Sequence, residues 1–231
     1  MRRYYAQCGP PGLPYSTCCH TFNATSITAA KLIFPPAQPA VRPGIPSRHH
    51  HLAYSTHDTR ATIEFYTRVM GMPLVGAVID DRIPSTKDAY TYLHTFFRME
   101  NGACLAFFES PGVPQLPPIE HRAHRIFNHL VLEVRTRADV DRWYDWLTAN
   151  GLEVLRADHG MIYSIYFFDP VNNIRLELTA TIDPTWNDRG EQASKAVEQW
   201  FDVQDRAKAE GRDVEVALRE FAQMRRNRLK S

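Results

Sequence analysis

The amino-acid sequence predicts an α+β fold made of two similar βαβββ halves, preceded by a disordered N-terminus and followed by a C-terminal helical extension. Three observations lead to this prediction. A weak internal repeat relates the segment starting at His51 to the one starting at His129. Within each copy, apolar residues follow first a strand-like and then a helix-like spacing. Proline-rich stretches precede the first copy and separate the two.

Each copy of the repeat begins with His-Leu on an alternating strand. HLAYSTHDTRATIEFYTRVMGMPLV in the first half parallels HLVLEVRTRADVDRWYDWLTANGLEV in the second. Thr-Arg-Ala leads each copy into an amphipathic helix, and Gly71 and Gly151 stand where a glycine would end that helix. Three apolar runs follow in each half, so each half is expected to be βαβββ. These runs are LVGAVI, YLHTFFRM and ACLAFFE, then EVLRA, YSIYFFD and IRLELTA.

Composition sets the domain boundaries. Residues 1–47 hold eight of the 16 prolines and no Asp or Glu, which is typical of disorder. The two-module domain is expected at 48–182, and helical spacing predicts a helical extension at 183–231. The modules are placed at 48–110 and 126–182, joined by a proline-rich linker at 111–125 in which neither a regular strand nor a helix is expected.

Charge and hydropathy exclude several classes of function. The 231 residues include 27 basic and 26 acidic ones, a balance that gives no field for nucleic acid or an anionic membrane surface. No apolar run approaches the roughly 18 residues that a membrane-spanning helix needs. Four cysteines without disulfide or zinc spacing favour the reducing cytoplasm. The expected partner is a small molecule.

Strand alternation groups three potential metal ligands. In the strand that opens the second half, Leu130 and Leu132 form the apolar face, so His129 points to the other side. The run IRLELTA puts Glu177 on the same side, and the same alternation turns His51 that way in the first half. If the half-sheets pair about a pseudo-twofold axis, two imidazoles and a carboxylate meet, as in the facial triad of Fe(II) sites.

Glu109 is a candidate fourth ligand, because it closes the first half as Glu177 closes the second. Two His and two Glu would suit Lewis-acid chemistry better than oxygen activation. His49 and His50 directly precede His51, so a shift of one or two residues in register would exchange that ligand.

With these residues in place, residues 48–182 resemble the vicinal-oxygen-chelate superfamily of glyoxalase I, type I extradiol dioxygenases and fosfomycin or bleomycin resistance proteins. The segments FYTRVMGMPLV, HTFFRMENGACLAFFE, FNHLVLEV and SIYFFDPVNNIRLELTA carry the resemblance. It implies paired modules forming a half-open barrel around a metal. The ligands would be His51, His129 and Glu177, with Glu109 added in the glyoxalase-like version.

The resemblance to extradiol enzymes has one departure. Their second-sphere histidine precedes the fourth strand of a module, where this chain has Ala103 or Cys104. His94 and His159 are candidates to replace it as catalytic groups, since a histidine can move protons near neutral pH. Tyr166 resembles the tyrosine that hydrogen-bonds the substrate. The aromatic residues expected to line the substrate site are Phe96, Phe107 and Tyr163.

The expected activity is that of an extradiol-type dioxygenase acting on a catechol-like aromatic or related vicinal diol, in aromatic compound catabolism, with Fe(II) as the metal. A glyoxalase-I-like lyase or isomerase using Mn, Ni, Zn or Co is the alternative, and a non-catalytic protein that binds a drug or metabolite is the second. Modules of this fold class pair within one chain or across a dimer. The C-terminal helices favour a homodimer.

Overall fold

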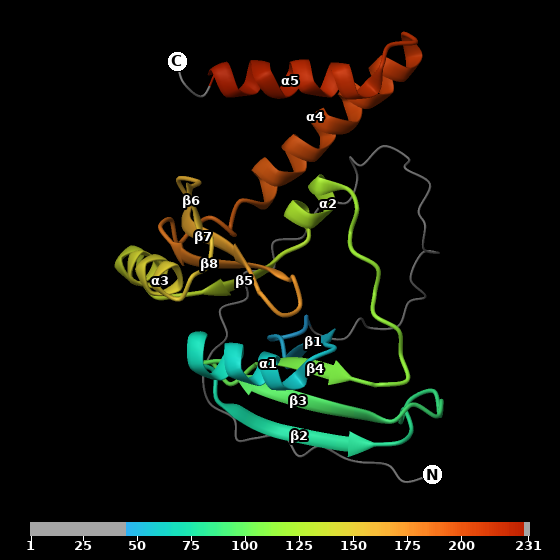
Figure 1. Cartoon of the computed structure of the whole chain (residues 1–231). Coiled ribbons are helices and arrows are strands. Elements are labelled where there is room, and N and C mark those ends of the chain that lie inside the picture. Colours follow the sequence, from blue (N-terminus) through green and yellow to red (C-terminus); the bar gives the residue numbers. More distant parts are fainter. Residues whose placement is uncertain (1–44, 229–231) are drawn as a thin grey trace, which may run out of the picture. The chain divides into compact units, whose positions relative to one another are not determined.

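The computed structural model describes residues 45–228 (Figure 1). The predicted disordered segment, 1–47, lies almost wholly outside the described residues. The chain divides into two compact units, one formed by Gly44–Ala193 and the other containing the described residues 194–228. Each unit is described by itself.

The first module is a four-stranded mixed sheet with one helix. Its strands lie in the order β1-β4-β3-β2, with β1 parallel to β4 and the other neighbours antiparallel. The Asp58 side chain accepts a hydrogen bond from the Ala61 backbone at the helix start, and Gly71 follows the helix with a φ of 69°. The elements are β1 (His51–Ser55), α1 (Thr59–Glu64) with its π-helical continuation η1 (Phe65–Val69), β2 (Leu74–Asp80), β3 (Tyr92–Arg98) and β4 (Cys104–Glu109).

The second module repeats this architecture, with strand order β5-β8-β7-β6. The predicted pair of βαβββ modules is therefore confirmed. One addition is α2 (Arg122–Phe127), which begins inside the linker for which no helix was expected. The prolines of that stretch end at Pro118, so the residues after it are free to form a short helix. The other elements are β5 (Leu130–Glu133), α3 (Arg137–Ala149), β6 (Leu155–Asp158), β7 (Ile162–Phe168) and β8 (Arg175–Thr181).

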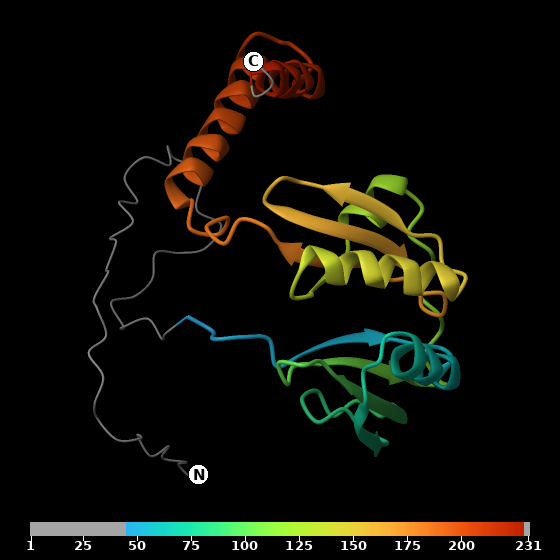
Figure 2. The ribbon, with the colours of Figure 1, turned by 90° about the vertical axis from the view of Figure 1, so that its left-hand side faces the viewer.

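The two modules share one hydrophobic core through the helix-covered sides of their sheets. Helices α1 and α3 lie next to each other in both views (Figures 1 and 2), and the Trp146 indole N–H donates to the Val69 carbonyl at 2.9 Å. A single cluster of buried side chains includes Phe97 and Phe107 from the first module and Leu176 from the second. The opposite side of each sheet is left for polar groups.

A buried hydrogen bond also joins the modules. Tyr66 on η1 is fully buried against Phe97 and Phe107, with ring centroids 5.4 and 4.9 Å away. Its hydroxyl donates at 2.9 Å to the carboxylate of Asp169, just beyond β7, which is 1% exposed. Burial, followed by the negative charge of Asp169, raises the pKa of Tyr66 well above its usual value. Tyr66 therefore acts as a hydrogen-bond donor.

We expect Tyr66→Phe to lower the free energy of unfolding by about 1.5–3 kcal/mol, because a buried carboxylate loses a donor while packing is retained. Urea denaturation followed by circular dichroism measures this change. Tyr54→Phe is the matched control, since the Tyr54 hydroxyl has no hydrogen bond with any residue in 45–228, and it should change the stability by less than about 0.5 kcal/mol. Equal effects of the two variants would contradict the role of the bond.

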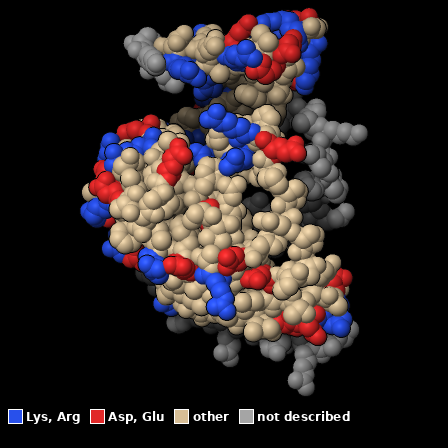
Figure 3. Space-filling view, viewed as in Figure 1, with Lys and Arg blue, Asp and Glu red and all other residues tan. Residues whose placement is uncertain are grey.

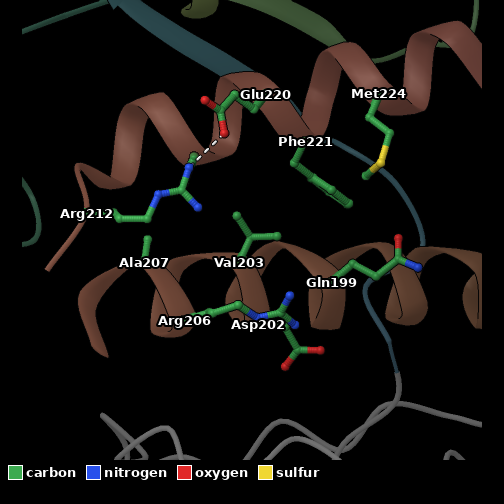
Figure 4. A pocket seen from close by; sticks show the side chains of 10 residues that line it. Gln199, Asp202, Val203, Arg206, Ala207, Arg212, Glu220, Phe221 and Met224 are labelled. Carbon is green, nitrogen blue, oxygen red and sulfur yellow. Dashed lines mark hydrogen bonds and ion pairs between the residues drawn. The ribbon is translucent and has the colours of Figure 1, made fainter. Parts of the chain in front are cut away.

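The C-terminal unit is a helical hairpin, as the sequence predicted. Helices α4 (Gly190–Ala209) and α5 (Val214–Arg228) are joined at Gly211, whose φ is 66°. Side chains of both helices line a groove of about 440 Å³ (Figure 4). Ala207 and Ala217 are buried there, and Arg212 forms an ion pair with Glu220 at 2.8 Å.

On the face drawn in Figure 3, Lys and Arg side chains are interspersed with Asp and Glu side chains, so no large patch of one charge forms there. This agrees with the net charge of +1. Among residues 45–228, no helix has the length and apolar character needed to cross a membrane.

Candidate metal and substrate site

The structure brings two of the three predicted metal ligands together. His129 immediately precedes β5, and Glu177 lies in the middle of β8, the strand that pairs with β5. The His129 Nε2 atom is 3.1 Å from Glu177 Oε2. Glu177 is only 2% exposed, whereas the His129 side chain remains 29% exposed. A buried carboxylate thus faces a partly exposed imidazole on the side of the sheet away from the core.

The hydrogen bonds of this pair leave either a proton or a metal ion between the two groups. His129 Nδ1 lies 2.9 Å from the Phe127 carbonyl, which can only accept, so Nδ1 carries a hydrogen. An unprotonated Nε2 would then direct its lone pair at a carboxylate oxygen, and the two would repel unless a proton or a metal ion lay between them. Ser164 donates to the other oxygen, Glu177 Oε1, at 2.6 Å. This donor set, with its supporting hydrogen bonds, fits a divalent metal.

A pocket of about 850 Å³ opens in front of this pair, and His129, Glu177, His159 and Tyr166 all line it. His159 Nε2 lies 2.9 Å from the Tyr166 hydroxyl. Burial, and then the negative charge of Glu177, raises the pKa of Tyr166, so this phenol keeps its proton. Two predicted catalytic residues therefore form a hydrogen-bonded pair beside the two predicted ligands. The remaining wall includes Trp186.

The other predicted residues gather on the first module. His51 Nδ1 lies 2.8 Å from His50 Nδ1, and the His51 ring is 6.0 Å from His94 and 5.6 Å from Phe96, centroid to centroid. His94 is 9% exposed and stacks on Phe108 at 3.6 Å. Burial, and then the proximity of His51, lowers the pKa of His94. The Nε2 atom of His94 is buried without a hydrogen-bond partner among the described residues.

Within one chain, His51 does not join His129 and Glu177. No three His, Cys, Asp or Glu residues within 45–228 are arranged to hold a metal ion. Every residue lining the pocket at His129 comes from the second module or from the segment after it. The modules pack through their helix-covered sides, so the predicted convergence of both histidines on one central cavity does not occur in the single chain.

Strand register moves Glu109 away from the ligand side. Ala53 on β1 pairs with Ala106 on β4, as Val131 on β5 pairs with Glu177 on β8, so Ala106 is the counterpart of Glu177. This corrects the pairing of Glu109 with Glu177 by repeat position. Glu109 Oε2 instead accepts a hydrogen bond of 2.9 Å from the Thr59 backbone at the start of α1.

Two residues predicted to line the substrate site lie in the core instead. Phe107 is fully buried and Tyr163 is 7% exposed, and both belong to the cluster that the modules share. The Tyr163 hydroxyl donates to Asp141 on α3 at 3.0 Å. The physical reason is strand alternation, because Phe107 has the parity of Leu105 on β4, which faces the core. Phe96 on β3 pairs with Ala106, which alternates with Leu105 and Phe107 on β4, so Phe96 faces the other side of the sheet and lies beside His51.

Ser164 is a site residue that the sequence reasoning missed. It lies on β7 two residues before Tyr166, which the family resemblance had placed at the site, so alternation along β7 would also have placed Ser164 there. In the first module the register position of Ser164 is taken by His94, opposite Phe108 as Ser164 is opposite Thr179. His94 has no glutamate beside it there, since Ala106 replaces Glu177.

The model of the Glyoxalase/Bleomycin resistance protein/Dioxygenase superfamily matches residues 48–178. Among solved structures, a glyoxylase/bleomycin resistance protein/dioxygenase domain from Frankia sp. EAN1pec is 17% identical, with 59% of this chain and 99% of that chain covered and a TM-score of 0.48. The fosfomycin resistance protein FosX from Listeria monocytogenes, complexed with Mn(II) and sulfate, is 20% identical, with 59% and 93% covered and a TM-score of 0.40. A glyoxalase/bleomycin resistance protein/dioxygenase from Nocardioides is 26% identical, with 62% and 89% covered and a TM-score of 0.41. No matching curated protein was found.

Proposed function

Because the chain belongs to the Glyoxalase/Bleomycin resistance protein/Dioxygenase superfamily, we propose that it is a metal-dependent enzyme, an extradiol-type dioxygenase of a catechol-like aromatic or related vicinal diol. The observation that carries the proposal is the His129–Glu177 pair, two potential metal ligands 3.1 Å apart, at a pocket that also holds the His159–Tyr166 pair. Fe(II) is the metal that this activity requires.

A second copy of the chain supplies the third ligand in this proposal. His51 is exposed and lies on a face with Phe96 and His94. Within residues 45–228 it forms no metal-holding group with His129 and Glu177. A twofold dimer that sets this face against the pocket of the other copy would build two equal centres, each from one His51, one His129 and one Glu177. Glu109, which caps α1, is not part of the set.

The side chains around the pocket handle the substrate proton. Bound Fe(II) would hold the diol and dioxygen together and pass electrons from the diol to dioxygen. The substrate hydroxyl donates a hydrogen bond to the Tyr166 oxygen, and the Tyr166 hydroxyl donates to His159 Nε2, 2.9 Å away. The proton that the substrate releases on binding is taken up by Tyr166 as Tyr166 gives its own proton to His159. Ser164 holds Glu177 in place through Oε1.

We expect His159→Gln to lower kcat by about 10²–10⁴-fold while the metal content stays unchanged, because the pocket loses its proton acceptor and keeps its ligands. Steady-state kinetics and elemental analysis measure the two quantities. His57→Gln is the matched control, since His57 is exposed in the loop before α1. An unaltered kcat, or loss of the metal in His159→Gln, would exclude the proton-transfer role.

The activity is tested on protein purified anaerobically, analysed for metal, loaded with Fe(II) and then exposed to air with a panel of catechols. Oxygen uptake with a yellow ring-fission product is the expected result. Turnover that needs Mn, Ni, Zn or Co and no oxygen would overturn the proposal in favour of a glyoxalase-like lyase or isomerase. Absence of any bound metal would overturn it in favour of a small-molecule binding protein.

A further inference from the structure

A second pocket of about 460 Å³ lies beside the proposed active site on the same module. Its lining includes three arginines, Arg122 and Arg125 on α2 and Arg175 on β8, together with apolar and aromatic side chains. We call it the arginine pocket. The single acidic residue in its lining is Glu153, so its side chains carry a local excess of two positive charges.

Two of the three arginines of this pocket, Arg125 and Arg175, are held in place without acidic partners. The Arg175 guanidinium lies over the Tyr166 ring, 4.4 Å from its centroid, and donates to the Ile126 carbonyl. Arg125 lies over Phe168 at 5.2 Å. None of the three arginines forms an ion pair with a carboxylate of residues 45–228, although most other arginine contacts of the described chain are of that kind. Fixed guanidinium groups without counter-charges favour the binding of an oxyanion.

The arginine pocket and the proposed active site are contiguous. Tyr166 lines both of them. Arg175 and Glu177 are two residues apart on one strand and point to the same side, which puts their Cα atoms about 7 Å apart. A single planar molecule the size of a substituted benzene ring can therefore reach both groups.

The βαβββ architecture does not require an arginine at this position. In the first module, Cys104 is the residue opposite His51 and so takes the position that Arg175 has in the second module. The first module nevertheless forms a sheet with the equivalent strand order. Arg175 donates to the Ile126 carbonyl and thereby ties β8 to the end of α2, whereas Arg122 and Arg125 are exposed on α2. Two of the three charges are thus unrelated to the packing of the sheet.

We propose that the arginine pocket binds the acidic group, a carboxylate or a phosphate, of an aromatic substrate. The ring of this substrate lies against Tyr166 and Phe168. The placement of its two vicinal oxygens at His129 and Glu177 rests on the proposed function, whereas the binding of the anion does not. The substrate class is then an aromatic diol that carries an acidic substituent.

The anion site is tested on the metal-free full-length protein by calorimetric titration with benzoate, phenyl phosphate and inorganic phosphate. We expect one of the two aromatic anions to bind, and Arg125→Gln and Arg175→Gln each to weaken that binding by about tenfold or more. The tighter aromatic anion identifies the acidic group. Arg125→Gln keeps the test informative if Arg175→Gln fails to fold, because Arg125 is exposed.

Arg156→Gln is the matched control, since Arg156 also lies over a tyrosine ring, Tyr144 at 3.5 Å, but has Asp141 as an acidic neighbour at 3.7 Å. It should bind the anions as the unaltered protein does. Failure of both aromatic anions to bind, or equal binding by all three variants, would overturn the anion site. Equal affinity for inorganic phosphate and phenyl phosphate would overturn the role of the aromatic side chains.

A kinetic comparison separates this inference from the proposed activity. With Fe(II)-loaded enzyme, Arg125→Gln should raise the KM for a dihydroxybenzoate at least tenfold and leave the KM for catechol unchanged. If no diol is turned over but the variants lose anion binding, the proposed activity is wrong and the anion site stands. If both diols are turned over and neither KM changes, the anion site is wrong and the activity stands.

Discussion

Mixed dimers of the inactive variants His51→Ala and His129→Ala should recover about half of the unaltered activity. One of the two centres in such a dimer contains both altered positions, whereas the other combines the intact His51 of one copy with the intact His129 and Glu177 of the other. Each mixed dimer therefore has one working centre out of two, and purification through both tags removes the dimers of a single variant, which have none. Co-expression of the variants with different affinity tags, followed by tandem purification and assay, measures the recovery.

The matched control for this experiment is a mixture of His129→Ala with Glu177→Ala. Both residues must come from the same chain, since they lie 3.1 Å apart on neighbouring strands, so no mixed dimer of these variants has an intact centre. This mixture should stay inactive. Complementation in both mixtures, or in neither, would rule out a centre shared between subunits in this way.

Glu177→Gln should reduce metal affinity by about 100-fold or more, whereas Glu109→Gln should leave it unchanged. Glutamine has the shape of glutamate and can still accept the hydrogen bond from Ser164, so the fold is retained while the charged ligand is lost. Mutation of a residue that only orients a metal ligand already lowers metal affinity by about 10–100-fold. Equilibrium dialysis against Fe(II) or Mn(II), with metal analysis of the protein, gives both values.

The comparison is sharp because the same substitution is made at two carboxylates with different surroundings. Glu177 faces an imidazole on the site side, and Glu109 accepts a backbone hydrogen bond at the start of α1. Glu109→Gln should therefore show at most a small loss of thermal stability. Equal loss of metal in both variants would bring back the four-ligand set of a glyoxalase-like enzyme.

Local patterns in the sequence were sufficient to predict the modules and the pairing of two of the three proposed metal ligands. Alternation along β5 and β8 put His129 and Glu177 on one side, and the structure has them 3.1 Å apart. The same rule, applied along β4 and β7, would have placed Phe107 and Tyr163 in the core and turned Glu109 away from the site. The pairing of residues by their position within the repeat, as for Glu109 and Glu177, was therefore less accurate than their assignment to one side of a strand by alternation.

The relation between the modules could not be predicted in this way. The sheet of each half has one side covered by a helix and one open side. The alternation of apolar residues is the same whether the two sheets pack through their helix-covered sides or through their open sides. The structure shows that the helix-covered sides share the core, with Tyr66 bonded to Asp169 and Trp146 bonded to Val69. The position of His51 relative to His129 depends on this long-range packing rather than on the alternation within either strand.

Each strand of these sheets serves two independent purposes, one on each side. The residues of one parity, such as Leu176 and Leu178, form the shared core, and those of the other, such as Arg175 and Glu177, form the polar side. An exchange of an alternate residue on β8 can therefore change what the polar side recognises while the packing beneath it is preserved. The chain thus has a scaffold whose polar side can change in single steps without repacking of the core.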